Sequence, residues 1–218
     1  MDNVQLIVKR GEVHALMGEN GAGKSTFMKI LAGLVIPDSG EIILDGEVLK
    51  NTRVTDVIKK GISMIHQEIL IVPELTVAQN IFLGREKSIT GTRIGWIQEK
   101  ILTSKATELL NKMGVAVAAD IKMKYLSVAQ MQMVEIAKAI SNDAKVIIMD
   151  EPTSAISNKE VDTLFRIIRE LKSNGVAIIY ISHKMDEIFE IADTITVLRG
   201  PTAKEVAASK MPPEVLFS

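Results

Sequence analysis

Short apolar runs of strand length alternate along this chain with segments in which apolar residues recur at helical spacing. Alternating or continuous apolar runs predict strands, and a spacing of three and four residues predicts amphipathic helices. Strands are expected at residues 5–8, 13–17, 62–66, 145–150, 176–181 and 194–198. Helices are expected at residues 24–32, 77–83, 98–113, 129–140, 159–172 and 184–191. This alternation is typical of an α/β protein with a mostly parallel sheet.

The first fifty residues have a different pattern of predicted elements, with strands joined by short turns. Residues 5–8 and 13–17 flank a turn, and residues 40–50 read as a hairpin through Asp45-Gly46. These early strands predict a small antiparallel β edge.

Residues 76–141 are almost entirely helical in period or loop-like, which indicates an inserted helical subdomain. The chain is therefore expected to form a single domain over residues 1–218 with three parts. These are a core at 1–70 and 143–200, the helical subdomain at 71–142, and an unassigned tail at 201–218.

Composition excludes several classes of protein. The net charge of -1 provides no basic field for nucleic acid, and the absence of cysteine excludes disulfides and thiolate metal sites. No signal peptide is visible after Met1, and the longest apolar runs, such as residues 176–181, are too short to span a bilayer. Any role at a membrane would therefore depend on a partner.

The stretch from Gly18 to Thr26 matches the phosphate-binding loop, G-x-x-x-x-G-K-[ST], between a predicted strand and a predicted helix. Its glycines allow successive N–H groups to surround a polyphosphate, and the helix directs its positive end at the same group. Lys24 would neutralise the β- and γ-phosphates, and the Ser25 hydroxyl would bind Mg²⁺. The candidate nucleotide-binding residues are Gly18, Asn20, Gly21, Ala22, Gly23, Lys24, Ser25 and Thr26. The alternative is a glycine-rich turn before an ordinary helix.

A second candidate site follows the apolar run at residues 146–149, which ends in Asp150 and Glu151. A central parallel strand would deliver both carboxylates to its carboxyl edge, on opposite faces. Asp150 would then bind Mg²⁺, and Glu151 would polarise the water that attacks the γ-phosphate. The alternative is a solvated turn at the end of a strand.

Together with two further motifs, these residues resemble the nucleotide-binding domain of ATP-binding-cassette (ABC) transporters. The motifs are Leu126-Ser127-Val128-Ala129-Gln130, similar to the family's signature loop, and Asp150-Glu151-Pro152-Thr153-Ser154-Ala155, with His183 after the next strand. The resemblance covers essentially the whole chain, and it is strongest to the first ATPase half of monosaccharide importers of the galactose or ribose type. It implies a P-loop NTPase fold.

The resemblance also implies roles for residues outside the two motifs above. Gln67 would contact Mg²⁺ or the attacking water, and His183 would hydrogen-bond the γ-phosphate. Ser127 and Gln130 would bind the nucleotide held by a second ATPase domain, and residues 154–157 would cross the same interface. Magnesium would be bound by Ser25, Gln67 and Asp150. His14 and His66 are expected to be structural.

As a whole, the resemblance implies an enzyme that binds ATP and Mg²⁺ and hydrolyses ATP to drive monosaccharide import. It would act in a pair, on the cytoplasmic face of the membrane. Its partners would be permease subunits, which dock near residues 68–74, and indirectly a sugar-binding protein.

The sequence departs from the family pattern in places. Val128-Ala129 replaces the usual paired glycines, and the usual adenine-stacking aromatic and the second ATPase half are absent. Weak adenine selectivity is therefore expected. Alternatives are a truncated, nucleotide-binding domain with little activity, a soluble ABC ATPase not linked to transport, and a kinase with the same loop. The stretch between Gln67 and Leu126 is too short for the coiled coil of many soluble ABC ATPases, and a kinase would have no use for residues 126–130.

Overall fold

The computed structural model describes residues 4–19, 21–49, 53–90, 98–199 and 202–207. The contacts within the chain divide it into two compact units. Unit 1 comprises Met1–Ile65, Ala144–Pro152 and Ile168–Ser218. Unit 2 comprises His66–Asp143 and Thr153–Ile167.

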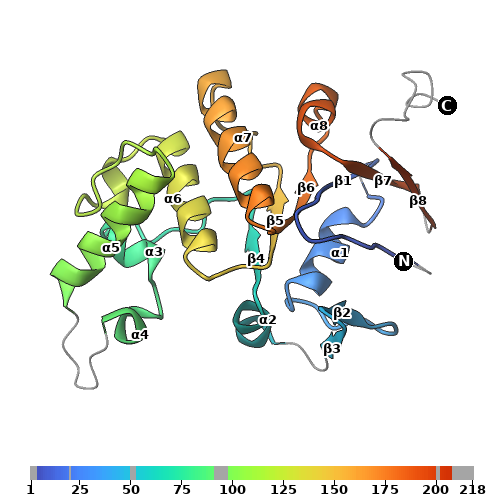
Figure 1. Ribbon diagram of the computed structural model, residues 1–218, viewed down its shortest axis with the longest axis horizontal. Coiled ribbons are helices and arrows are strands. Elements are labelled where there is room, and N and C mark those ends of the chain that lie inside the picture. The colour runs from blue at the N-terminus through green and yellow to red at the C-terminus, as the bar shows by residue number, and fades with distance from the viewer. Residues whose placement is uncertain (1–3, 20, 50–52, 91–97, 200–201, 208–218) are drawn as a thin grey trace. The chain divides into compact units, whose positions relative to one another are not determined.

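Within the described residues, unit 1 contains a six-stranded sheet in the order β4-β5-β6-β1-β7-β8 (Figure 1). The strands are β1 (Val13–Gly18), β4 (Ile62–Ile65), β5 (Val146–Asp150), β6 (Ala177–Ile181), β7 (Thr194–Arg199) and β8 (Thr202–Ala207). Neighbouring strands pair in parallel, except that β8 runs antiparallel to β7. The prediction of an α/β fold with a mostly parallel sheet is confirmed.

Both faces of this sheet are covered, which explains why its central strands are almost wholly apolar. On one face Leu16 of β1 belongs to a buried cluster with Met28 of α1 (Lys24–Leu31) and Val57 of α2 (Val54–Lys60). On the other face Ala15 packs with Ile188 of α8 (Met185–Ile191) and with a residue of β7. Fully burying one such large side chain contributes about 1.5–3 kcal/mol.

The predicted hairpin is confirmed as a separate two-stranded sheet of β2 (Ile42–Leu44) and β3 (Glu47–Leu49). Asp45 and Gly46 both have positive φ, 51° and 82°, as a two-residue turn of type I′ requires. The hydrogen bond from Lys145, and then that from Arg10, hold the pKa of the Asp45 carboxyl below its usual range.

The prediction of a strand at residues 5–8 is wrong, and so is the placement of residues 13–17 in an antiparallel edge. Residues 4–8 have no regular structure, although Val4, Leu6 and Val8 pack at alternate positions against the core. Alternating burial produced the strand pattern, but a strand also needs a neighbour to bond. Residues 13–18 instead form β1, an inner strand paired in parallel on both sides.

The tail, for which the sequence predicts no element, begins with β8. This strand pairs with β7 from Thr194 opposite Ala207 to Arg199 opposite Thr202. Residues 208–218 lie outside the described part of the chain.

Unit 2 is helical in its described residues. Its elements are α3 (Val77–Ile81), α4 (Glu86–Thr90), α5 (Glu99–Lys112), the 3₁₀ helix η1 (Met123–Tyr125), α6 (Val128–Ile140) and the first part of α7 (Asn158–Ser173). α3 packs against both α5 and α6, with Val77 and Ile81 fully buried. Across the ranges that the structure describes, no helix is long and apolar enough to cross a membrane.

Candidate functional site

The phosphate-loop candidates occupy the connection between β1 and α1. Gly23 precedes the helix with φ 91°. At Gly18 a Cβ atom would lie 2.6 Å from the carbonyl oxygen of Leu198, so β7 approaches too closely for any side chain. Glycine therefore meets a backbone requirement at both positions.

Lys24 lies over this loop. Its Nζ donates hydrogen bonds to the carbonyl oxygens of Gly18, at 2.7 Å, and Glu19, at 3.1 Å. Ser25 and Thr26 follow it in the first turn of α1 and are exposed, whereas Ala22 is partly buried. Asn20 was also predicted to bind nucleotide, but it lies outside the described residues. A cation and two hydroxyl side chains thus stand at the start of a helix.

Asp150 ends β5, and Glu151 is the next residue. The φ of Glu151 is 46°, in the left-handed region, which costs about 1–2 kcal/mol for a residue with a side chain. Its N–H donates to the carbonyl oxygen of Ile181 at 2.9 Å, which holds this conformation against β6. Backbone strain of this kind is concentrated at functional sites.

His183 follows β6 and contacts Glu151. Its Nδ1 lies 3.1 Å from Oε1 of Glu151, and the side chains are 72% and 25% exposed. Because an ionised carboxylate only accepts hydrogen bonds, Nδ1 carries the proton in this contact. The second nitrogen, Nε2, could then donate to an anion only if the ring were also protonated there.

The register of the sheet brings these segments to one edge. Asp150 stands opposite Ile181, and Leu16 of β1 stands opposite the same residue. The strands β5, β6 and β1 therefore end at one level, and the glutamate, the histidine and the phosphate loop follow their carboxyl ends. In an open α/β sheet this edge is where ligands bind.

The remaining candidates belong to unit 2. Gln67 is exposed, two residues after the end of β4. Ser127 and Gln130 begin α6 with a reciprocal capping box: Oγ of Ser127 accepts from the N–H of Gln130, and Oε1 of Gln130 accepts from the N–H of Ser127. Both candidates thus have a structural role at a helix N-terminus.

His14, expected to be structural, is fully buried on β1. Its Nε2 lies 2.7 Å from Oγ1 of Thr196, and its Nδ1 lies 3.2 Å from Oε1 of Glu12. Both ring nitrogens are therefore engaged within the core.

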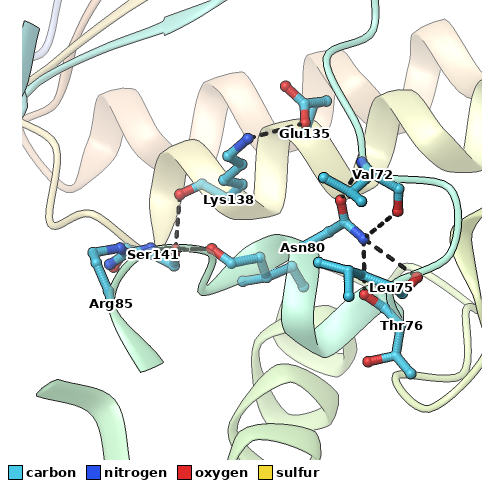
Figure 2. A network of polar contacts seen from close by, with 9 residues as sticks. Val72, Leu75, Thr76, Asn80, Arg85, Glu135, Lys138 and Ser141 are labelled. Atoms are coloured by element: carbon cyan, nitrogen blue, oxygen red, sulfur yellow. Dashed lines mark hydrogen bonds and ion pairs between the residues drawn. The ribbon is translucent and has the colours of Figure 1, made fainter. Parts of the chain in front are cut away.

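Residues 72–76 in unit 2 are held by the buried side chain of Asn80 (Figure 2). Its Oδ1 accepts from the N–H of Val72 at 2.8 Å. Its Nδ2 donates to the carbonyl oxygens of Val72 at 3.1 Å and Thr76 at 3.0 Å, with a longer contact of 3.4 Å to Leu75. One amide thus fixes most of the segment that leads into α3.

The carboxyl groups of Glu135 and Glu74 in unit 2 have shifted pKa values. Burial raises the pKa of Glu135, while its ion pair with Lys138 at 3.4 Å acts in the opposite direction (Figure 2). The pKa of Glu74 is lowered by its hydrogen bonds from Lys124 and then Lys122. Glu74 is therefore anchored to the segment before α6.

Asn80 and Glu187 are buried polar residues to which the sequence assigns no role. The exposed fractions of the two residues are 1% and 8%. Asn80 lies three residues after the buried Val77, and Glu187 lies four residues before the buried Ile191, so helical spacing places both on an apolar face, whereas their polar residue types indicate the surface. Only the contacts within the fold show that they are bonded in the interior.

The sequence of the chain is similar to those of known proteins. The family model described as ABC transporter matches residues 1–154. A ribose/galactose/methyl galactoside import ATP-binding protein of Geobacillus kaustophilus is 60% identical over 199 residues, which are 91% of this chain and 39% of that protein. A protein of the same name from Rhizobium etli is 51% identical over 221 residues, covering all of this chain and 42% of its own length. The chain thus spans about two fifths of the length of these relatives.

Solved structures have a similar fold. The crystal structure of a nucleotide-free ATP-binding cassette from an ABC transporter matches with a TM-score of 0.84 and 26% identity, over 100% of this chain and 91% of that one. A dimeric cassette in a post-hydrolysis state, bound to ADP and Pi, matches with a TM-score of 0.79 and 26% identity, over 94% and 89%. The chain has the P-loop fold of these cassettes, and it belongs to the ABC transporter family.

Proposed function

We propose that this chain binds and hydrolyses ATP to power monosaccharide import through a membrane permease. The observation that carries this proposal is the pair formed by Glu151 and His183 at the ends of β5 and β6. It stands one strand away from the phosphate loop that follows β1. A carboxylate base, a histidine and a phosphate cradle at one edge of a sheet are the parts that phosphoryl transfer to water requires.

Each residue has a role in this proposal. Lys24 and the N–H groups of the loop bind the phosphates of ATP, where the start of α1 adds its positive dipole. Glu151 accepts a proton from the attacking water. His183 holds Glu151 through Nδ1 and contacts the γ-phosphate through Nε2. That second bond requires protonation of Nε2, or release of Glu151 by Nδ1.

Magnesium fits the residues proposed to hold it. Ser25 and Asp150 would supply hydroxyl and carboxylate oxygens, which are ligands that Mg²⁺ prefers, and Gln67 of unit 2 is proposed to add an amide oxygen. Among the described residues no group of three or more His, Cys, Asp or Glu could bind a metal by itself. The ion would bind together with its nucleotide. The bound ion would neutralise charge on the β- and γ-phosphates.

A second copy of the domain would complete the site. Ser127 and Gln130 at the start of α6 would contact the nucleotide held by that copy, with residues 154–157 at the same interface. The dimeric cassette bound to ADP and Pi supports this pairing. We place the pair on the cytoplasmic face of the membrane, docked on permease subunits near residues 68–74. A sugar-binding protein outside the membrane would act on it indirectly.

ATP turnover with Mg²⁺ tests the proposal directly. Replacing Glu151 by Gln removes the base but keeps the size of the side chain, and the rate should fall about 10²–10⁴-fold. Binding of ATP to this variant should be unchanged. Equal background rates in the two proteins would leave a nucleotide-binding domain without activity, the main alternative.

The link to sugar transport needs a separate experiment. The names of the relatives, ribose/galactose/methyl galactoside import ATP-binding proteins, favour it over a soluble ATPase. Co-expression with monosaccharide permease subunits should give a complex whose ATP turnover rises when a sugar-loaded binding protein is added. ATP turnover that changes neither with the permease subunits nor with the sugar-loaded binding protein would favour the soluble ATPase instead.

A further inference from the structure

His183 lies on the turn between β6 and α8 and contacts Glu151, and buried residues on either side of it hold this turn. His183 itself is mostly exposed, with 72% of its side chain accessible. The residue before it, Ser182, is buried, and so is Glu187 in the first turns of α8. An exposed imidazole on a short turn can adopt several rotamers, so the turn beneath it decides how well its contact with Glu151 is maintained.

Glu187 bonds to groups on both sides of the histidine. Its Oε2 accepts hydrogen bonds from the hydroxyl groups of Tyr180, at 2.8 Å, and Ser182, at 3.2 Å. Its Oε1 pairs with Nζ of Lys184 at 3.0 Å. One carboxylate therefore ties the end of β6 to the residues immediately before and after His183.

The hydroxyl of Ser182 completes this arrangement. It donates its proton to Glu187, and its oxygen accepts the backbone N–H of Lys184 at 3.1 Å. Because the hydroxyl has a single proton, the carboxylate determines its orientation and leaves a lone pair for that N–H. A glutamine in place of Glu187 would have one acceptor oxygen instead of two and would direct an NH₂ group at either the hydroxyl groups or Nζ of Lys184, which weakens the bonds that hold the turn around His183.

Burying a carboxylate costs free energy, and glutamate is seldom buried unless it is paired. We propose that Glu187 is a positioning residue, which holds the turn of residues 182–184 so that His183 stays on Glu151 during ATP hydrolysis. This inference rests on the proposed function. A displacement of about 1 Å at a reacting group can lower a rate about 10²-fold, so the effect should appear in kcat.

The test is a double-mutant cycle on the full chain, with Mg²⁺ and ATP as the probe. Glu187→Gln should lower kcat about 10–100-fold and leave KM within about threefold. His183→Ala should lower kcat at least as much. Because residues that act as a unit are not additive, Glu187→Gln should cause no further loss in the His183→Ala background. Glu190→Gln is the matched control, since Glu190 lies on the same helix, exposed and paired with Arg169, and its rate should match the wild type.

Hydrogen exchange supplies a readout that does not depend on activity. In Glu187→Gln the amide of Lys184 should exchange faster, whereas the amides of β1 should not. Should this variant fail to fold, Tyr180→Phe removes one bond to the same carboxylate, and the same two measurements apply to it.

The outcomes separate the two proposals. Losses that multiply in the double variant, or unchanged exchange at Lys184, would overturn the role of Glu187. If wild type and Glu151→Gln hydrolyse ATP equally slowly, the proposed function fails instead. In that case Glu187 has no reaction to serve, and the inference falls with it.

Discussion

Replacing Asn80 by Asp should weaken the anchoring of residues 72–76, because the change removes donors and keeps an acceptor. The N–H of Val72 would still find a carboxylate oxygen where it now bonds Oδ1. The donations to the carbonyl oxygens of Val72 and Thr76, at 3.1 and 3.0 Å, would be lost. Each such bond contributes about 1 kcal/mol, so we expect a loss of at least about 2 kcal/mol at pH 7.

The partners left behind limit the size of this loss. The carbonyl oxygen of Val72 also accepts the N–H of Leu75 at 3.1 Å, and that of Thr76 accepts the backbone N–H of Asn80 at 2.9 Å. Neither carbonyl is therefore left unbonded. Asn80→Leu also removes the oxygen that accepts the N–H of Val72. This variant should therefore lower the free energy of unfolding by about 3 kcal/mol.

The two variants should differ in their pH dependence. A carboxylate introduced among carbonyl groups in a buried site has its folded-state pKa raised above the unfolded value of about 3.9. The neutral form is then the one the folded state tolerates, so the penalty grows as pH rises through the folded pKa. It shrinks as pH falls toward the unfolded pKa. Asn80→Leu has no titrating group and should show no such trend.

Hydrogen exchange of a peptide that covers residues 68–76, with urea unfolding alongside, provides the assay. A loss of about 2 kcal/mol corresponds to exchange about 30-fold faster where local opening governs it. The control is Asn111→Asp, the same substitution at an exposed position of α5, which should change the free energy of unfolding by less than about 1 kcal/mol. Exchange at 68–76 that is the same in Asn80→Asp as in this control would refute the reasoning.

Three further predictions concern stability. Gly18→Ala should lower the free energy of unfolding more than Gly21→Ala. Both glycines have positive φ, but only at Gly18 would a Cβ meet a backbone atom, the carbonyl oxygen of Leu198. The reverse order in urea unfolding would contradict this reasoning. Glu135→Gln should raise stability at pH 8, because burial raises the pKa of Glu135 and the folded state disfavours the charged form above that pKa. Thermal melts should show the gain shrinking as pH falls toward the unfolded value of about 4.3, and no pH-dependent gain below it. Ser127→Ala should cost about 1 kcal/mol by removing the cap of α6 in urea unfolding, whereas Ser127→Thr should retain most of it.

The elements with strong local signals were predictable. The Asp45-Gly46 hairpin, the loop before α1 and the apolar strands β5 and β6 depend on backbone preferences and on runs of residues close in sequence. At residues 5–8 the local pattern did not predict the structure. Their alternating burial is real, but a strand exists only when another strand bonds to it, and the pattern carries no information about that partner.

By itself, the sequence determined which residue types stand at strand ends: the lysine and serine of the loop, Asp150 with Glu151, and His183. The tertiary structure decided that β5, β6 and β1 are neighbours, so that Glu151 meets His183 at 3.1 Å. It also decided the left-handed φ of Glu151 and the burial of Asn80 and Glu187. The physical reason is that strand pairing and the burial of a polar group depend on residues distant in sequence, whereas periodicity reports only on near neighbours.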